Sequence, residues 1–506
     1  MKSFRWVRRI LLLMVTALLP LQASAFTPYD SYTYSMATGT EKHVHSPAPF
    51  IPGQYLNAEA MGVTLSRPSD FTFGPDGSLY IVDTGQNRIV VLDEEYRFVR
   101  EIAGFTNEGK EETFSSPQGL FVASNGSLYI CDTENSRIVY LDAQGELVRI
   151  YTCPETPALK TGYVFKPLKI AVDDAGTLYV NKTQENSGLM KNTAEGKNVS
   201  YNGSNKAIVN PVVQFWKNLL SPEQRDQMMD FIPVEFNNIS MDDSGFIFAV
   251  SASTAEDNPI KRLNLSGDDI LVRSGYVDVM GDVLFKITPD PNDASKKVED
   301  RSVLVDICSS SNGNYFVLDS QKGRIFTYNR EGYLLYAFGT KGTQIGTFQN
   351  PCAIEVRGEN LLVLDQVAGS ITIFNKTKYA KQITKAEDDY YSGRYEESME
   401  GWNEVLRTNA FFEFAYQQQG KIYLHQGDDE MAMKCFELGN YRGDKITFMT
   451  GYNKAFTEFR KDFMSQYLGV MVIGGVGLWL LLYLLHRWRK KRKGKKAARP
   501  TGGEDR

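Results

Sequence analysis

The sequence predicts a mainly β protein: a six-bladed β-propeller, followed by an α-helical repeat module and a single transmembrane helix. Three observations predict this order. One strand pattern recurs six times between residues 66 and 375, residues 376–462 repeat at an interval of 34 residues, and 23 uncharged residues run from Phe463 to Leu485. A chain of 506 residues is long enough for about three folded parts.

Residues 1–25 have the pattern of a cleaved export signal. Basic residues come first, an apolar run extends from Ile10 to Leu19, and the small residues Ala23-Ser24-Ala25 follow. The alternative is an uncleaved anchor, but the apolar run has only about half of the roughly 20 residues that a bilayer requires. We therefore expect cleavage before Phe26, with residues 26–65 forming a lead segment before the propeller.

The repeated strand is clearest in Leu79–Thr84 and Leu128–Thr133, each of which begins two residues after a glycine. A unit consists of an apolar strand, a turn, a β-branched strand and a third strand, and some units add a fourth. Four strands repeated six times predict a propeller. In four of the six units the repeated strand ends on an aspartate. The residues at this aligned position are Asp83, Asp132, Lys182, Ser251, Asp319 and Asp365.

The second unit resembles the NHL repeat, a propeller blade motif. The resemblance is carried by the segment from Phe114 to Val122 together with Gly126–Ile138. The first unit also matches well, and the fifth and sixth match moderately. The third and fourth depart, because Lys182 and Ser251 replace the acidic residue. The resemblance implies that the Asp and the Asn-x-Arg pair are structural links within and between blades.

Extra length in the third and fourth steps predicts an insert. Residues 211–220 have apolar side chains at helical spacing, and Ser221-Pro222-Glu223 has the pattern of an N-cap with proline at the first helical position. We expect a helical insert near 205–232 on one face of the propeller. It either covers a ligand site as a lid or packs against a blade edge.

The segment 376–462 is expected to be helical. Its second half repeats the first, so that Ala386, Tyr390, Gly393 and Trp402 have counterparts in Gly420, Leu424, Gly427 and Phe436. The segment resembles two tetratricopeptide repeats. This resemblance implies a groove for peptides or partner helices, and the alternative is a spacer that lifts the propeller from the membrane.

Phe463–Leu485 is long enough to cross a bilayer as a helix. Ten Lys and Arg residues follow in the tail 486–506, against two acidic residues, which predicts a cytoplasmic tail and an extracellular segment from Phe26 to Asp462. The chain is therefore expected to be a single-pass protein of the cell membrane. Contact between the basic tail and anionic headgroups follows from the same charges.

The extracellular segment is acidic. The whole chain has 56 Lys and Arg against 61 Asp and Glu, and 14 of the basic but only 2 of the acidic residues lie in the two ends, which leaves a net charge near −17. Such a surface argues against nucleic acid as a ligand and suits a soluble extracellular domain.

Little conventional catalytic chemistry is predicted. The four histidines lie outside the predicted blades, which excludes a His-ligated zinc and a Ser-His-Asp triad inside the propeller. One set of candidate residues remains. It consists of the residue that precedes the apolar core of the first strand in each unit, a position that should face the central tunnel. We expect a ligand-binding polar ring there, formed by Asp70, Lys169, Asn238 and Asp306, while Gly119 and Ala353 complete the ring.

Three of these residues support an alternative. By their positions around the axis, Asp70, Asn238 and Asp306 are similar to the divalent-metal ligands of gluconolactonase-type propellers, which hydrolyse sugar lactones. Lys169 breaks that pattern, because an ammonium group repels a metal ion and offers an ion pair instead. We expect neither a metal nor a cofactor, and a metal site at these three residues is the alternative.

The whole layout resembles membrane-anchored NHL-propeller proteins of Gram-positive bacteria that accompany carbohydrate ABC transporters. This resemblance implies a non-enzymatic extracellular scaffold. Its propeller would bind a glycan or a protein, and its helical repeats would bind a membrane protein or transporter subunit. The rival is a metal-dependent lactonase. A sensor is disfavoured, because a tail of about 20 residues holds no domain.

Overall fold

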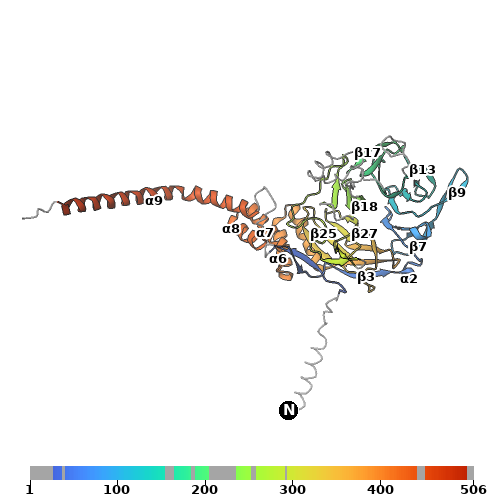
Figure 1. The fold of residues 1–506 in the computed structure, drawn as a ribbon, viewed down its shortest axis with the longest axis horizontal. Helices are drawn as coiled ribbons and strands as arrows, with labels where there is room; N and C mark the ends of the chain where they lie inside the picture. Colours follow the sequence, from blue (N-terminus) through green and yellow to red (C-terminus); the bar gives the residue numbers. More distant parts are fainter. Residues whose placement is uncertain are drawn as a thin grey trace, which may run out of the picture. The chain divides into compact units, whose positions relative to one another are not determined.

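The computed structural model divides the chain into two compact units, residues 1–412 and 413–506. The predicted six-bladed propeller, the helices after it and the long apolar C-terminal helix are all confirmed (Figure 1). The expected signal peptide and the expected helical insert near 205–232 lie outside the described residues. The structure describes residues 27–36, 40–153, 164–183, 188–203, 235–251, 258–290, 293–440 and 451–497.

Six sheets form the propeller, and the first strand of each lies innermost. Each of these strands contacts the first strand of the next sheet, and the last contacts the first, so the ring is closed. The strands are β4 (Asp70–Phe73), β10 (Gly119–Val122), β14 (Pro167–Val172), β18 (Phe236–Met241), β23 (Leu304–Ser309) and β27 (Pro351–Arg357).

The remaining strands of each sheet follow outward in antiparallel order. Within the described residues the fourth sheet has three strands. In the first three sheets the outer strands are β5 (Leu79–Asp83), β6 (Arg88–Leu92), β7 (Phe98–Ile102), β11 (Leu128–Asp132), β12 (Arg137–Leu141), β13 (Leu147–Tyr151), β15 (Leu178–Lys182), β16 (Leu189–Asn192) and β17 (Asn198–Asn202). In the last three they are β19 (Ile247–Ser251), β20 (Ile260–Leu263), β24 (Tyr315–Asp319), β25 (Arg324–Tyr328), β26 (Leu334–Phe338), β28 (Asn360–Asp365) and β29 (Ser370–Lys376).

The outermost strand of the sixth sheet comes from the N-terminal part of the chain. Strand β3 (Phe50–Leu56) pairs antiparallel with β29, and a short helix, α2 (Ala58–Met61), follows it. The expectation that 26–65 only leads into the propeller is therefore wrong. Phe50 is 1% exposed and stacks on Phe338 with ring centroids 5.2 Å apart, so it belongs to the propeller core.

The same lead segment also extends the fifth sheet. Strands β1 (Tyr32–Ser35) and β2 (Lys42–His45) form a hairpin, and β1 pairs with β26. The expectation that no histidine lies in the blades is thus corrected, because β2 carries His43 and His45 at the outer edge of this sheet. His43 Nε2 lies 3.1 Å from the buried Asp282 carboxylate, which also accepts a 2.6 Å hydrogen bond from the Tyr34 hydroxyl.

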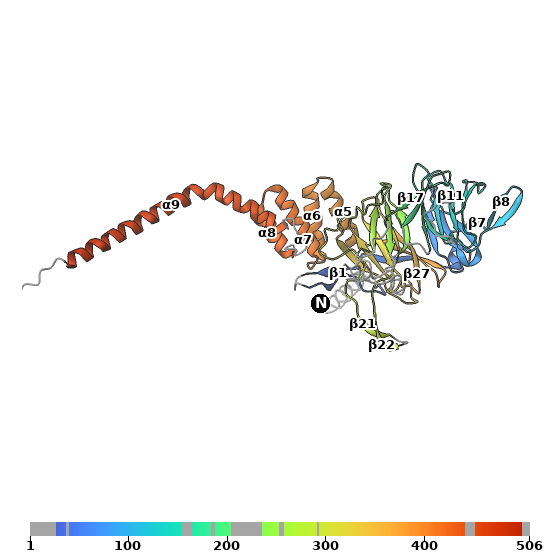
Figure 2. The ribbon, with the colours of Figure 1, turned by 45° about the horizontal axis from the view of Figure 1, so that its top comes forward.

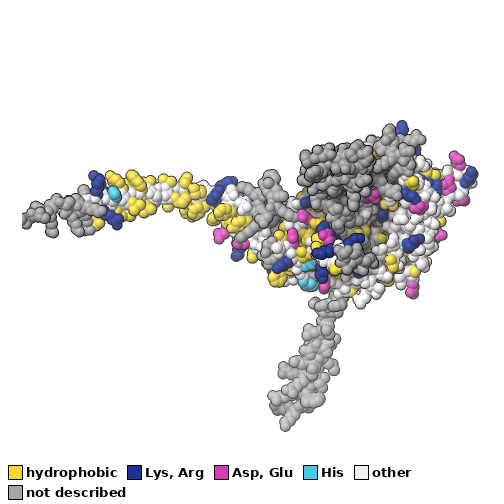
Figure 3. Space-filling model, in the orientation of Figure 1, with side chains coloured by type: hydrophobic (Ala, Val, Ile, Leu, Met, Phe, Trp, Pro, Cys, Tyr) yellow, Lys and Arg dark blue, Asp and Glu magenta, His cyan; other side chains and the backbone are white. Residues whose placement is uncertain are grey.

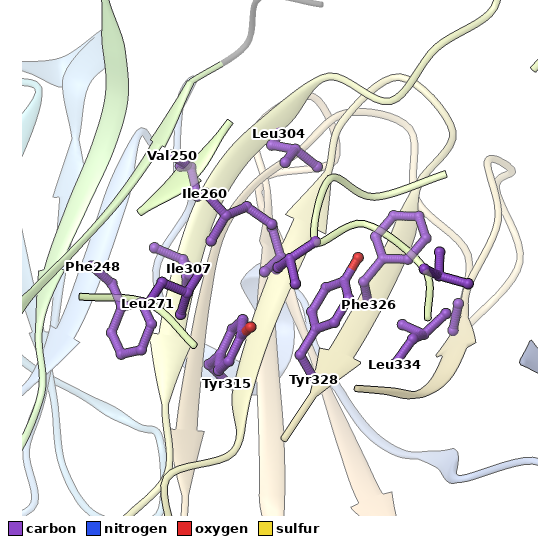
Figure 4. Close-up of a cluster of buried hydrophobic side chains, with 14 of the residues drawn as sticks. Phe248, Val250, Ile260, Leu271, Leu304, Ile307, Tyr315, Phe326, Tyr328 and Leu334 are labelled. Carbon is purple, nitrogen blue, oxygen red and sulfur yellow. The ribbon is translucent and has the colours of Figure 1, made fainter. Parts of the chain in front are cut away.

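Apolar side chains fill the spaces between neighbouring sheets. Figure 4 shows the cluster that joins the fourth and fifth sheets, in which Phe248 and Tyr315 lie with ring centroids 5.1 Å apart. Such burial drives the sheets together face to face. Two hairpins project from this body, formed by β8 (Gly104–Asn107) with β9 (Lys110–Thr113) and by β21 (Ile287–Asp290) with β22 (Asp293–Glu299) (Figure 2).

A helical hairpin of α5 (Lys378–Tyr391) and α6 (Tyr395–Thr408) completes the first unit. Thr377 caps α5 by accepting a hydrogen bond from the Ala380 N–H. The buried carboxylate of Glu387 accepts hydrogen bonds from the side-chain amides of Asn314 and Asn329 in the fifth blade, at 3.1 and 2.9 Å. This hairpin is therefore fixed to the propeller rather than loosely suspended from it.

The second unit holds α7 (Glu413–Gln426), α8 (Asp429–Leu438) and α9 (Gly451–Ala497). Gly420 lets α7 approach α8 closely, since a Cβ there would lie 2.6 Å from the Phe436 ring. Helix α9 is long and apolar enough to cross a membrane. Figure 3 shows a stretch of hydrophobic side chains along it, with basic side chains on either side of that stretch. The tetratricopeptide assignment of these helices is still a prediction.

We expect Phe50→Ala to destabilise the propeller by about 3–5 kcal/mol, because it removes a buried ring from the strand that closes the sixth sheet. The matched control is Phe98→Ala, in an outer strand where the ring is 40% exposed, and its loss should be well under half as large. Chemical denaturation of both variants measures the difference. A loss below about 1 kcal/mol for Phe50→Ala would show that β3 is not part of the cooperative unit.

Candidate functional site

A cavity of about 420 Å³ lies on the propeller axis, and all six innermost strands contribute to its lining. Alternation along a strand points every second residue at the axis. The cavity therefore has successive layers of side chains. The first layer holds the four residues predicted from the aligned repeats, Asp70, Lys169, Asn238 and Asp306, which the structure does bring to one cavity.

Lys169 and Asp70 form a buried ion pair across this layer. The Lys169 Nζ lies 2.9 Å from Asp70 Oδ1 and donates a 3.1 Å hydrogen bond to the Ser69 carbonyl. Burial opposes the charged form of Lys169, but the carboxylates of Asp70 and Asp306 raise its pKa above the ordinary value. The third blade is thus tied to the first by a fully charged ammonium group.

Asn238 and Asp306 form the second link. The Asn238 side-chain amide donates to Asp306 Oδ1, which also accepts a 2.8 Å hydrogen bond from the Ile307 N–H. The other oxygen, Oδ2, accepts a 2.6 Å hydrogen bond from the Ile354 N–H of the sixth blade. Asp70 behaves in the same way, accepting from the Leu120 N–H of the second blade at 3.2 Å. Both carboxylates therefore connect neighbouring blades.

Glu355 is the functional candidate that the sequence analysis missed. It lies in β27, two residues after Ala353, and so lines the next layer of the cavity. Burial, together with Asp306 and Asp70, raises its pKa to about 8, and a hydrogen bond with the Thr72 side chain partly offsets this rise. Extending the repeat alignment by two residues along each strand would have found it.

The two layers contain more acids than cations. Burial raises the pKa of Asp306 to about 7, although the Lys169 ammonium opposes that rise. Glu355 is therefore largely protonated near neutral pH and able to donate a hydrogen bond, whereas Asp306 is about half protonated and both of its oxygens accept backbone hydrogen bonds. Burial also raises the pKa of the Cys308 thiol, so Cys308 and the protonated Lys169 are not activated nucleophiles.

The acidic residues shared by the repeats lie away from the axis and are structural. Asp132 accepts hydrogen bonds from the Ser115 N–H and from the Arg137 guanidinium, both at 2.7 Å, and so fastens its own blade together. Asp83 does the same with the Ser66 N–H and Arg88. The adjacent Thr84 and Thr133 hydroxyls reach the next blade. These contacts agree with the structural role that the resemblance implied.

One repeat of the propeller matches a known family model. The NHL repeat model matches residues 114–139. No curated protein matches the chain. Among solved structures, a virginiamycin B lyase from Staphylococcus aureus is similar with 15% identity and a TM-score of 0.36, over 67% of this chain and 85% of that one.

Two further solved structures are similar at the same low level. A streptogramin B lyase shares 15% identity at a TM-score of 0.38, over 64% of this chain and 97% of that one. A protein of unknown function from Bacteroides thetaiotaomicron shares 10% identity at a TM-score of 0.40, over 69% and 90%. At this level of identity, likeness says nothing about activity.

The raised pKa values predict a pH-dependent stability. Asp306 and Glu355 hold protons in the folded state over a range, from about 4 to about 7 or 8, where the unfolded chain has lost them. The free energy of unfolding should therefore fall as pH rises through this range. Glu355→Gln should flatten the fall by at least about 1 kcal/mol between pH 6 and 8.5, as measured by denaturation at each pH. An unchanged slope would show that Glu355 is ionised in the folded protein.

Proposed function

We propose that the protein is a non-enzymatic scaffold of the cell surface, anchored by α9. In this proposal the export signal is removed, the propeller and the helical pairs lie outside the cell, and the basic tail stays in the cytoplasm. The propeller would bind a glycan or a protein. The helical pairs would bind a membrane protein, for which a transporter subunit is the candidate that the sequence resemblance implies.

The observation that carries this proposal is the state of the axial polar groups. Asp70, Asn238 and Asp306 form hydrogen bonds with neighbouring blades. Lys169 is paired with Asp70. A catalytic group must instead be free to reach a substrate atom in the reacting geometry. These contacts support a structural role for the first layer. In the next layer, the protonated Glu355 carboxyl is able to donate a hydrogen bond to a ligand that carries hydroxyl groups.

The lactonase alternative requires a divalent ion at Asp70, Asn238 and Asp306. These groups do not fit one, because the Lys169 ammonium lies 2.9 Å from Asp70 and repels a cation, and because both Asp306 oxygens already accept backbone N–H groups. No catalytic step through a metal follows from this geometry.

Removing the ammonium tests this reasoning. Lys169→Ala should give the protein a calcium affinity that the wild type lacks, because two carboxylates then face the cavity without a counter-charge. Lys166→Ala, three residues earlier and paired with Glu134, is the matched control and should bind no calcium. Calorimetric titration measures all three proteins. Tight calcium binding by the wild type, with lactone hydrolysis that chelators abolish, would instead establish the lactonase.

Topology is tested in intact cells. Protease added outside should digest the propeller and leave a short fragment that contains the tail, because the basic residues after the apolar stretch hold that end in the cytoplasm. N-terminal sequencing of the mature chain should begin at Phe26. Protection of the propeller from protease would overturn the proposed orientation, and a retained Met1 would indicate two anchors.

A further inference from the structure

The second layer of the axial cavity has two chemically different sides. Each innermost strand contributes one residue to it, two positions after the residue of the first layer. The fourth, fifth, sixth and first blades form a polar side, and the second and third blades form an apolar side opposite it. The six residues, all of which line the cavity, are Thr72, Phe121, Ala171, Ser240, Cys308 and Glu355.

The strand register fixes this two-sided ring. Each innermost strand pairs regularly with the second strand of its sheet from the first-layer residue onward, and in four of the six strands a register shift occurs just before that residue. Side chains two positions apart therefore point in the same direction, toward the axis. A slip by one residue would turn a whole strand over, so the ring cannot rearrange locally.

The polar side has hydrogen-bonding capacity that the protein itself does not use. The Glu355 carboxyl accepts hydrogen bonds from the Val356 N–H and the Thr72 side chain, and neither contact uses the proton that the carboxyl holds near neutral pH. The Ser240 side chain is partly exposed to the cavity, and among the described residues its hydroxyl has no hydrogen-bond partner. This side therefore presents a carboxyl donor and a free hydroxyl to a ligand.

The apolar side is formed by a fixed aromatic ring. Phe121 is partly exposed to the cavity and packs against Tyr129, with ring centroids 6.4 Å apart and an angle of 60° between the planes. Beside it, Ala171 adds only a methyl group, so the space in front of the ring is not filled from the third blade. The negative face of an aromatic ring attracts C–H groups, which suits a ligand with a hydrocarbon face.

The charges of the cavity favour a neutral ligand. In the first layer, Lys169 and Asp70 neutralise each other as an ion pair. The Lys169 ammonium opposes a cation, and the partly ionised Asp306 opposes an anion. The wall also includes Asp243, an exposed residue of the turn after β18, so the cavity reaches the surface near a further negative charge.

We propose that the second layer of the axial cavity binds a single pyranose ring, with its C–H face on Phe121 and its hydroxyl groups toward Glu355 and Ser240. A pyranose combines an apolar ring face with a rim of hydroxyl groups in one small neutral unit. The cavity volume of about 420 Å³ lies in the range of about 300–1,000 Å³ of small-molecule sites. The inference rests on the proposed function, in which the propeller binds a glycan or a protein, and it adds the size of the ligand and the residues that contact it.

The test titrates the full-length chain in lipid nanodiscs with the methyl glycosides of glucose, galactose and mannose, followed by saturation-transfer NMR. At least one of them should bind with a Kd below about 5 mM, and the C–H protons of one ring face should receive most saturation. The uronic acid counterpart of that sugar should bind at least about tenfold more weakly, and its amino-sugar counterpart no more tightly. A disaccharide that ends in the same unit should bind equally if the cavity takes the end of a glycan chain, and more weakly if it takes a free sugar.

Variants assign the binding to the second layer. Glu355→Leu and Phe121→Leu should each weaken it by at least about fivefold, because leucine keeps the bulk but removes the hydrogen bond or the ring. The matched controls Glu146→Leu and Phe98→Leu, at exposed positions of the outer strands, should change it by less than about twofold. Ser240→Ala should weaken it by about threefold, and since that hydroxyl has no partner in the described protein, this variant breaks no structural contact.

Three outcomes would overturn the inference: no neutral sugar with a Kd below about 5 mM, an amino sugar that binds at least about tenfold more tightly than its neutral parent, or equal effects of the cavity variants and their controls. The wider proposal has separate readouts. If the sugars fail to bind but the anchored protein crosslinks to a membrane partner in its own cells, the sugar site fails and the scaffold stands. If NMR shows that the bound glycoside is cleaved, the sugar site stands and the non-enzymatic scaffold fails.

Discussion

A hydrogen bond from a side chain to the start of the next innermost strand recurs around the propeller, and the other features depend on the ring that it holds together. The donors at four successive junctions are Thr84, Thr133, Asn181 and Asn237, each 2.6–2.7 Å from the accepting carbonyl. Between the sixth blade and the first, the Cys352 thiol lies 3.4 Å from the Pro68 carbonyl. Fixing the first residues of each innermost strand also fixes which side chains face the axis.

These junctions explain how much of the fold could be predicted. Where Asp-Thr ends the repeated strand, the link is visible in the sequence, and the first two blades were recognised from it. The third and fourth blades lack the motif, and asparagine makes the link instead, through Asn181 in β15 and Asn237 in β18. Because a hydrogen-bond donor there can be supplied from different positions, no single sequence pattern marks it. Only the spacing of the strands identified these blades.

The axial cavity and the sixth blade also differ in how far the sequence predicts them. The four residues of the first axial layer were predictable because one position per repeat, fixed by strand register, determines them. Strand β3 was not, because Pro52 and Gly53 interrupt its alternation and its partner β29 lies more than 300 residues later.

The pairing of β3 with β29 also orders events during synthesis. Strand β3 is made among the first of the propeller strands, yet its partner is nearly the last, so an unfinished chain carries an unpaired strand edge while five blades are being completed. Strand β3 can join the sixth sheet only once residues 370–376 are available, immediately before α5 begins at Lys378. The helical hairpin that docks through Glu387 therefore reaches the fifth blade just as the sixth is completed, and any chain that stops before Ser370 leaves β3 without its partner strand.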